Sequence, residues 1–541
     1  MTRYTRRTDL KVLAIALCLL SACSRESSDN TSPVPIEEVR LILPSETLEI
    51  VRPSIEAFNA ARLLITGSGT VVRLSAVTAD GVAATQVVSD SALNHKTTVW
   101  LSSNSALLEL ARSRLSQEKQ LEEKHSQEKY SMDGCRAVAS TVMGAAFISS
   151  NAFAVEQDGG SALYGQFILD STERDLARTP MILAGLPSSS VSGVSTLIMS
   201  GATVLKSKVE SLSPTSSTES EQALSPSQRR ISRYFASDRA MLEWMALRQE
   251  GRPLVAITTR QQVTAHNLVV PNTSLQFLPA VLPELRLNYQ LCALQSKTTS
   301  TAAREAQQLI ITFLTNSERL APFKQLGFDE PLALNNEGAQ PAVQAVERLL
   351  APWHSIKKPS TVTFVIDSSS RLTRALSETI KRELSQFILA DGARRDTFAL
   401  VSSSTRPELL SAPTADLGAF KDAILEIRGS GASAIRDAII MAIDLYAEAS
   451  PEQNRGAIIV LTNGPDSASS ATTTALKGRA LSCMNRKGVA LYVIGVSNSS
   501  ETPSNTPSDI AQLTQEIGGT FIATTVGELP AALHGVFREV E

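Results

Sequence analysis

The sequence predicts an α/β protein made of two modules, each built on a largely parallel sheet. In residues 39–101 and again in residues 361–536, short apolar runs alternate with segments of helical periodicity, a pattern typical of parallel strands joined by crossover helices. The chain has 541 residues, of which 43% are apolar, and this is more than one hydrophobic core normally spans. We therefore expect separate packed units along the chain.

The N-terminus has the pattern of an export signal. Three arginines at positions 3, 6 and 7 precede an apolar run over residues 12–20, which is too short to span a bilayer as a helix but typical of a signal peptide. The run ends in Leu20-Ser-Ala-Cys23, which resembles a bacterial lipobox. This resemblance implies a signal peptide over residues 1–22, acylation of Cys23 and a polar tether over residues 23–35.

Acyl chains on Cys23 would hold the protein at a membrane, because each buried methylene contributes roughly 0.8 kcal/mol. Ser24, rather than an aspartate, follows the cysteine, and by the same resemblance this favours the outer membrane if the source is Gram-negative. We predict a lipid-anchored protein of the cell envelope, at the outer membrane or the periplasmic face. An ordinary signal peptide is an alternative, and Arg6-Arg7 also resembles a twin-arginine signal, so the export route stays open.

Three apolar runs of the first module each lead into a helical segment. They cover residues 39–43, 71–77 and 97–101. Residues 111–131 are densely charged and predict a solvated helix. Residues 211–227 are rich in Ser, Thr, Pro and Glu without apolar periodicity, so we expect a disordered insertion loop there.

Several motifs of this module resemble an extracellular solute-binding protein. They are Phe58-Asn59, Val99-Trp-Leu-Ser-Ser103, Pro187-Ser-Ser-Ser-Val-Ser-Gly193 and the helical stretch 302–328, which ends in Gly-Phe. The resemblance covers about residues 36–350 and implies a bilobed, periplasmic-binding-protein-like module of type II with a solute cleft. Serines on its strand-to-helix turns are candidate cleft residues, although such serines are more often simple caps: Ser45, Ser102, Ser103, Ser190 and Ser192.

A linker over residues 351–360 is expected to lead into the second module, residues 361–541. This module again alternates strands and helices. The predicted strands cover residues 362–366, 397–402, 457–461, 489–496 and 520–523, and the predicted helices cover residues 372–389, 417–427, 434–449, 471–484, 510–517 and 526–536.

Polar residues interrupt this module after three of its predicted elements. Asp367-Ser-Ser-Ser-Arg371 follows the first strand, and Gly431-Ala-Ser433 and Thr462-Asn463-Gly464 come later. Open α/β sheets bind ligands at the carboxyl ends of such strands. In this order the motifs resemble the metal-ion-dependent adhesion site of a von Willebrand factor A domain, which implies a doubly wound, Rossmann-like fold.

In that family an aspartate, two serines, a threonine and a second aspartate hold the metal ion. Here Asp367 and Ser369 keep their types, while Arg371, Ser433 and Asn463 replace the second serine, the threonine and the second aspartate. A guanidinium cannot ligate a cation, and it attracts a carboxylate at about 4 Å by roughly 4 kcal/mol before desolvation is subtracted. We therefore expect Arg371 to neutralise Asp367 and to leave a degenerate site with no cofactor. If Arg371 points into solvent instead, Asp367, Ser369 and Ser433 could retain a weak Mg²⁺ site.

Composition and motifs exclude other classes of function. The 51 basic and 54 acidic residues nearly cancel and form no dense basic block, so no nucleic-acid partner is expected. The five histidines lie beside no nucleophile elbow and no metal-ligand spacing, which argues against an enzyme. Cysteines 135, 292 and 483 remain after export, so at least one of them has no intramolecular disulfide partner.

Together these patterns predict a membrane-anchored lipoprotein that binds a protein or another envelope component through its second module. The first module would act as a sensor or as a second binding surface. The alternative is a solute-capture protein associated with a transporter, in which the second module serves as a docking element. An enzyme acting on the envelope would need an acid–base pair that the sequence does not contain.

Overall fold

The computed structural model describes residues 34–540 with gaps. The gaps are residues 95, 123–130, 149–179, 205–215, 249–252, 272–273, 281–284, 332–342, 357–358, 391–395, 450–454, 488, 498–507 and 518. The predicted signal peptide, Cys23 and most of the tether lie outside the described residues. In the part described, strands form one nine-stranded and one six-stranded sheet, which confirms the mixed α/β class. No described helix is both long and apolar enough to cross a membrane.

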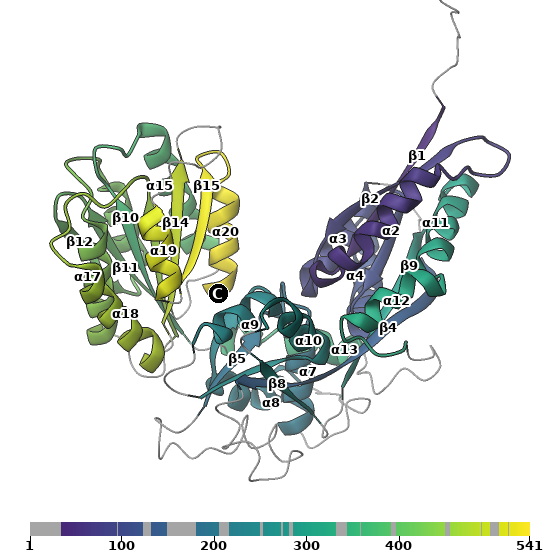
Figure 1. Ribbon diagram of the computed structural model, residues 1–541, viewed down its shortest axis with the longest axis horizontal. Helices are drawn as coiled ribbons and strands as arrows, with labels where there is room; N and C mark the ends of the chain where they lie inside the picture. The colour runs from purple at the N-terminus through teal and green to yellow at the C-terminus, as the bar shows by residue number, and fades with distance from the viewer. Residues whose placement is uncertain are drawn as a thin grey trace, which may run out of the picture.

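The first module opens with the predicted alternation of strands and helices (Figure 1). Strand β1 (Ile36–Leu43) pairs in parallel with β2 (Val71–Thr78) and with β3 (Thr98–Ser102). Their apolar residues are buried because helices cover them. The covering helices are α2 (Leu48–Ala61), α3 (Gly81–Leu93) and α4 (Ser105–Glu122), and a single 3₁₀ turn, Ser45–Thr47, precedes α2.

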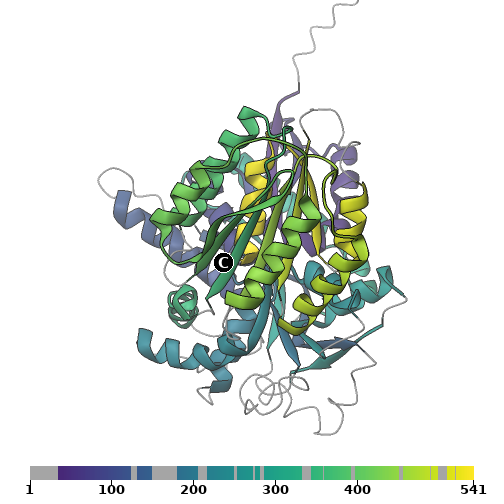
Figure 2. The same cartoon turned by 90° about the vertical axis from the view of Figure 1, so that its left-hand side faces the viewer.

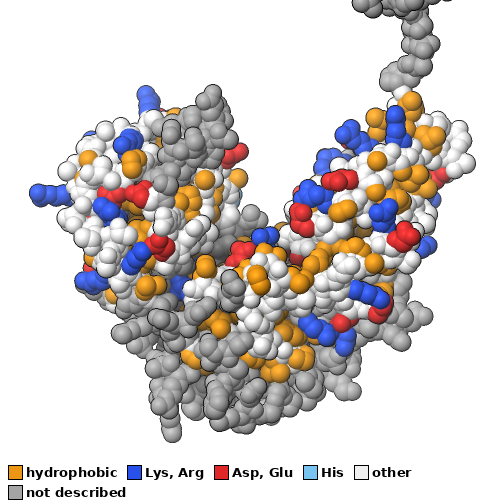
Figure 3. Space-filling model, viewed as in Figure 1, with side chains coloured by type: hydrophobic (Ala, Val, Ile, Leu, Met, Phe, Trp, Pro, Cys, Tyr) orange, Lys and Arg blue, Asp and Glu red, His pale blue; other side chains and the backbone are white. Residues whose placement is uncertain are grey.

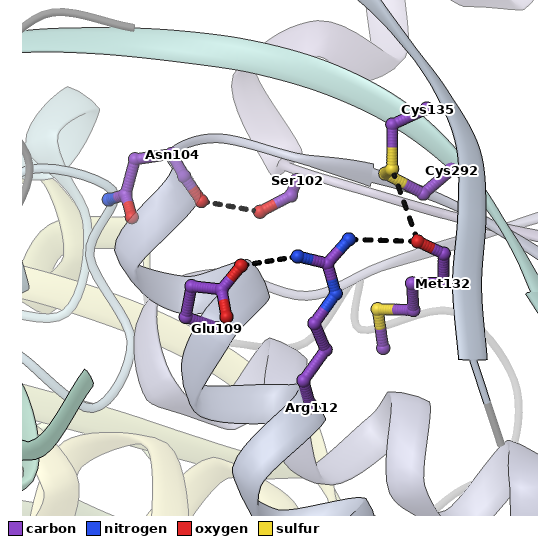
Figure 4. The surroundings of a disulfide bond; sticks show 7 residues. All are labelled: Ser102, Asn104, Glu109, Arg112, Met132, Cys135 and Cys292. Atoms are coloured by element: carbon purple, nitrogen blue, oxygen red, sulfur yellow. Dashed lines mark hydrogen bonds and ion pairs between the residues drawn. A yellow bond between two sulfur atoms is a disulfide. The ribbon is translucent and has the colours of Figure 1, made fainter. Parts of the chain in front are cut away.

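Two antiparallel strands that the sequence analysis leaves out tie this module together. Strands β4 (Ser131–Ile148) and β9 (Arg286–Gln295) pair with each other, and β9 also pairs with β3. A disulfide between Cys135 and Cys292 joins them (Figure 4). Beside it Arg112 donates to the Met132 carbonyl at 2.8 Å (Figure 4). The sequence predicts an odd cysteine but does not identify this pair.

The remaining strands continue the same sheet, whose order is β2-β1-β3-β9-β4-β7-β5-β6 with β8 also paired to β4. Their bounds are β5 (Met181–Gly185), β6 (Ile231–Phe235), β7 (Leu254–Thr259) and β8 (Leu275–Pro279). The helices here are α7 (Gly193–Val204), α8 (Ser217–Arg230), α9 (Asp238–Ala246) and α10 (Arg260–Val269), and α11 (Thr301–Leu314) and α12 (Ser317–Gln325) return to the first strands.

The prediction of a disordered loop over residues 211–227 is wrong for residues 217–227, which belong to α8. Ser216 caps this helix by accepting a hydrogen bond from the Glu219 amide at 3.1 Å, and Ser-x-x-Glu is a recognised helix start. Ala223 and Leu224 are buried between the helix and its neighbours. The short apolar pair is enough because α7 and α13 (Val343–Leu350) pack against α8. Residues 211–215, and residues 123–130 of the predicted charged helix, lie outside the described part.

The predicted linker is partly built into the first module. Its helix α14 (Trp353–Ile356) places Trp353, 2% exposed, in the first module's core. The Trp353 ring stands edge-on to Tyr234 with centroids 5.6 Å apart. The first module therefore extends into the stretch assigned to the linker.

The second module is a doubly wound sheet in the order β12-β11-β10-β13-β14-β15. All neighbours are parallel except the edge strand β12, which is antiparallel to β11. The five predicted strands are present and β12 is additional. The bounds are β10 (Ser360–Asp367), β11 (Thr397–Ser403), β12 (Pro407–Thr414), β13 (Arg455–Thr462), β14 (Ala490–Ser497) and β15 (Thr520–Thr525).

Helices cover both faces of this sheet, and each face has its own apolar core. One core contains a cluster of phenylalanines in which the Phe387 and Phe537 rings stack 3.9 Å apart. The predicted helices are all present, with ends that differ by a few residues. They are α15 (Arg374–Ala390), α16 (Leu417–Leu425), α17 (Ile435–Ala449), α18 (Thr473–Lys487), α19 (Ser508–Glu516) and α20 (Leu529–Val540).

The second module sits on the part of the first module formed by β5–β8 and their helices, away from β1–β3 (Figures 1 and 2). Helix α20 contacts β6 across this junction. An open notch separates the second module from α2 and α3 in the space-filling view (Figure 3). Ser360 and Arg455, at the amino ends of β10 and β13, lie at the junction, so the carboxyl ends of these strands point away from it.

Candidate functional site

Asp367 lies at the carboxyl end of β10, between β11 and β13, and is 2% exposed. Its Oδ1 accepts a hydrogen bond from the Ser369 amide at 3.1 Å. Its Oδ2 accepts from the Thr462 hydroxyl at 3.2 Å and from the Asn463 amide at 3.4 Å. The carboxylate thus ties the loop after β10 to the loop after β13. Thr462 was not predicted as a partner, although it stands beside Asn463 in the Thr-Asn-Gly motif.

The third loop, before α17, is hydrogen-bonded to both of the others. The Ser370 amide donates to the Gly431 carbonyl at 2.9 Å, and the Ser430 amide donates to the Ser368 carbonyl at 2.7 Å. The Ser433 carbonyl accepts from the amides of residues 467 and 468, both at 2.8 Å. Three loops far apart in the sequence are therefore held together, as the family resemblance implied. We call Asp367, Ser369, Arg371, Ser433 and Asn463 the Asp367 site.

Acidic side chains near this site hold the loops in place. Asp466 is buried, accepts from the Arg436 amide at 3.0 Å at the start of α17, and pairs with the Arg436 guanidinium. Asp437 accepts from the amides of Ser470 and Ala471, both at 2.8 Å. Burial raises the pKa of Asp437, but these hydrogen bonds outweigh it, so its pKa is lowered overall. Both carboxylates therefore support the loops of the Asp367 site.

Three side chains of the Asp367 site bury polar atoms that have no hydrogen-bond partner among the described residues. They are the hydroxyls of Ser369 and Ser433 and both amide atoms of Asn463. Buried polar groups in proteins are normally paired. With Asp367 they form an oxygen donor set, and Mg²⁺ or Ca²⁺ takes such oxygens. Asp367 is the one carboxylate of this set, and the described residues contain no cluster of three or more His, Cys, Asp or Glu side chains that could hold a metal.

Arg371 does not form the predicted ion pair with Asp367, and that expectation is wrong. Arg371 is exposed, and its Nη1 donates to the Pro465 carbonyl at 3.3 Å. A Cβ on Gly464 would lie 2.3 Å from the same nitrogen, so the guanidinium rests on the bare backbone of that glycine. Asp367 faces inward, where Thr462 and two amides already bind it. The competing hydrogen bonds explain why the pair does not form.

The candidate cleft serines of the first module are mostly engaged in the fold. Ser190 donates to Asp238 at 2.5 Å, and the Ser192 amide donates to the same carboxylate at 3.2 Å. Ser102 donates to the Asn104 carbonyl at 2.8 Å (Figure 4), and Ser103 beside it is buried. The structure therefore places Ser102 and Ser103 at the end of β3 and brings Ser190 and Ser192 together with Asp238.

Ser45 leads to acidic residues that the sequence analysis did not select. Its amide donates to Asp80 at 2.8 Å, and the neighbouring Glu46 accepts from the Tyr289 hydroxyl at 2.9 Å. Burial, followed by the charge of Asp80, raises the pKa of Glu46 well above its usual value. Burial also raises the pKa of Asp80. We call Glu46, Asp80 and Asp238 the acid cluster. Each of them follows a parallel strand in the sequence, and this position could have identified them as candidates.

The start of α3 closes against the loop that follows β5. The amides of Val82 and Ala83 donate to the carbonyls of Pro187 and Ser188 at 3.0 and 2.8 Å. Gly81 has a φ of +55°, and a Cβ there would lie 2.6 Å from the Pro187 carbonyl oxygen. These two amides at the start of α3 therefore bind the protein's own backbone.

Residues 362–465 match the family model described as the von Willebrand factor type A domain. The chain contains a von Willebrand factor A domain. No match was found among curated proteins. The matched stretch includes the whole loop after β10 and the residues Ser433 and Asn463, so the family match and the Asp367 site fall on the same part of the chain.

Solved structures show the same likeness. The von Willebrand factor domain of the type V pili tip protein Mfa5 from Porphyromonas gingivalis is 14% identical, with a TM-score of 0.27, over 34% of this chain and 94% of that chain. The protein BatB from Bacteroides thetaiotaomicron is 18% identical, with a TM-score of 0.27, over 34% of this chain and 97% of that chain. The pilus adhesin SpaC from Lactobacillus rhamnosus GG is 15% identical, with a TM-score of 0.28, over 34% and 30%. At these scores the structures add no argument to the family match.

Proposed function

We propose that this protein is a lipid-anchored component of the cell envelope that binds a protein or another envelope component through the Asp367 site. Acylated Cys23 would anchor it, and the von Willebrand factor A domain would present the site away from the first module. The observation that carries the proposal is the set of buried, unpartnered side-chain atoms on Ser369, Ser433 and Asn463 around Asp367. The proposed activity is binding and not catalysis.

We further propose that the Asp367 site is a degenerate metal-ion-dependent adhesion site that retains weak affinity for Mg²⁺ or Mn²⁺. The premise for a neutralised site was the Arg371–Asp367 ion pair, which the described contacts do not contain. Asp367, Ser369, Ser433 and the Asn463 carbonyl oxygen would hold the cation, with water completing the coordination. One negative charge among neutral donors supports weak binding only. The bound cation would offer a coordination position to an oxygen of the partner.

Calorimetric titration of the mature chain with Mg²⁺ and Mn²⁺ tests the cation. We expect saturable binding in the wild type and none in Asp367→Ala. Asp444→Ala is the matched control, because Asp444 lies on α17 in a surface ion pair with Arg479 at 2.8 Å and should leave binding intact. Absence of saturable binding in the wild type would remove the cation and leave the partner question open.

Site-specific photo-crosslinking in cells of the source organism tests the partner. A crosslinking amino acid at exposed Ser370, in the Asp367 site's own loop, should capture one defined component. The same amino acid at exposed Gln512 on α19 is the control position. The product captured from position 370 should disappear in Asp367→Ala. Binding through this site would be contradicted if both positions captured the same component equally, or if the product from position 370 persisted in Asp367→Ala.

Solute capture is the second candidate, and the acid cluster supports it. Glu46 Oε2 is buried and has no hydrogen-bond partner among the described residues, while its neighbours Asp80 and Asp238 are also acidic. We propose that a solute held here would be a small amine, since a cation would relieve the repulsion between these carboxyl groups. A thermal-shift screen of amines tests it. If no amine changes the melting temperature but an anionic solute raises it, the proposal that the solute is an amine is wrong.

A further inference from the structure

The junction between the two modules is built from arginines and aromatic rings. Arg233 of β6 donates from Nη2 to the Tyr492 hydroxyl of β14 at 3.3 Å. Arg248, just after α9, donates to the Ile517 carbonyl at the end of α19 at 3.4 Å. Arg455 of β13 lies 5.2 Å from the centre of the Tyr234 ring. All three guanidinium groups thus cross from one module to the other.

Arg233 is the least satisfied of these groups. It is 4% exposed, and its Nε and Nη1 have no hydrogen-bond partner. Its guanidinium carbon lies 4.4 Å from the Phe235 ring centre and 4.8 Å from that of Trp244. Rings stabilise the flat face of a guanidinium, but its N–H groups point outward in the plane and require acceptors. Among the described residues, no carboxylate forms an ion pair with Arg233.

A second positive charge lies on the same tryptophan. The Arg248 guanidinium carbon is 3.8 Å from the centre of the Trp244 ring. Burial, and then the charge of Arg233, lowers the pKa of Arg248 to about 9. Arg233 and Arg248 therefore place two positive charges on one ring, while on the second module's side the charge of Asp396 stabilises the guanidinium of Arg455.

A small cavity lies at this junction. Arg233 and Tyr234 from the first module line it together with Ser360, Arg455 and Tyr492 from the second. Its volume is about 20 Å³, which is enough for one water molecule or one small ion. A phosphate ester or a nucleotide is larger than this volume. Its walls carry two arginines and two tyrosines, but no acid.

We infer that this cavity binds one small inorganic anion of chloride size, held by Arg233 with Arg455 nearby. The anion would accept the hydrogen bonds that Nε and Nη1 of Arg233 cannot place elsewhere. It would also offset the positive charge of Arg233, which lies on the same ring as Arg248. Because its walls come from both modules, the anion stabilises the docking of the von Willebrand factor A domain on the first module.

Thermal unfolding of the mature full chain at constant ionic strength tests the site. Chloride is exchanged for gluconate, which cannot enter the cavity, and the difference in melting temperature between the two salts is compared across variants. On replacing gluconate with chloride, the melting temperature of the wild type should rise by roughly 2 °C or more beyond the rise seen in Arg233→Met. Arg239→Met is the matched control, because Arg239 is an exposed arginine on α9 paired with Glu243 at 2.7 Å. It should keep the full chloride effect.

Crystals of the wild type grown in bromide give a second measurement that needs no variant. We expect an anomalous peak beside Arg233. If the cavity holds only water, the peak is absent and the salt exchange affects the wild type and Arg233→Met equally. Either result overturns the inference, and neither depends on the Asp367 site.

Discussion

The Asp367 site and the acid cluster are built in the same way but differ in how many of their buried polar atoms have hydrogen-bond partners. Both lie on loops at the carboxyl ends of parallel strands, where α/β folds bind ligands. In the acid cluster, Asp238 accepts from Ser190, Ser192 and Thr258 at 2.5–3.2 Å, and among the described residues only Glu46 keeps a carboxylate oxygen, Oε2, that is buried without a partner. In the Asp367 site, Ser369, Ser433 and Asn463 keep buried polar atoms without partners. A polar turn becomes a strong ligand candidate only where the fold leaves its atoms unsatisfied.

Removing the disulfide of the first module should give the largest loss of stability among the variants proposed. The disulfide Cys135–Cys292 spans 157 positions, and replacing both cysteines by serine should cost about 4 kcal/mol by releasing the unfolded chain. Urea unfolding followed by tryptophan fluorescence measures it. The same loss in the reduced wild type would confirm the cause. An unchanged midpoint would show that β4 and β9 hold the module without the bond.

Asp238→Ala should give the next largest effect, about 3 kcal/mol of unfolding free energy. The substitution leaves three buried donors without their charged acceptor. Asp444→Ala is the control, since that exposed carboxylate forms a surface ion pair and such pairs contribute less than about 1 kcal/mol. Chemical denaturation compares the two. Equal effects would mean that Asp238 does not organise the loop after β5.

The acid cluster should also make the first module sensitive to rising pH. The raised pKa of Glu46 in the folded state means that folding favours its protonated form. This contribution is complete below the ordinary pKa of a glutamate and is lost as the pH rises toward the folded-state pKa. The loss is about 1.4 kcal/mol for each pH unit between the two values. Glu46→Gln should therefore gain stability over the wild type as the pH rises, measured by unfolding at several pH values, and a constant difference would contradict it.

Ser433→Ala should have the smallest effect, within about 0.5 kcal/mol in the absence of divalent cations. Its hydroxyl has no partner to lose, in contrast to Asp238. With Mg²⁺ present, the wild type should melt at a higher temperature and the variant should show less of this gain. Differential scanning calorimetry with and without the cation measures both quantities. A large loss without the cation would show that the hydroxyl has a structural role.

Much of the second module could be predicted from its sequence because its strands are buried on both faces. Apolar runs such as residues 362–366 therefore stand out from the helices between them. The edge strand β12 was missed because its residues are half-buried or exposed and include prolines, which strand patterns disfavour. The helix after the Asp367 loop begins at Arg374, later than predicted, because Thr373 caps it by accepting from the Leu376 amide at 3.2 Å.

The sequence by itself determined the α/β class, the alternation of elements, and the three loops that form the Asp367 site. These follow from periodicity and from motif order, which are local properties of the chain. Only the tertiary structure decided which cysteines pair, that Arg371 rests on Gly464 instead of binding Asp367, and that two nitrogens of Arg233 are buried without an acceptor among the described residues. Each of these depends on distances between residues far apart in the sequence, where several hydrogen bonds compete and the packing of the whole chain selects among them.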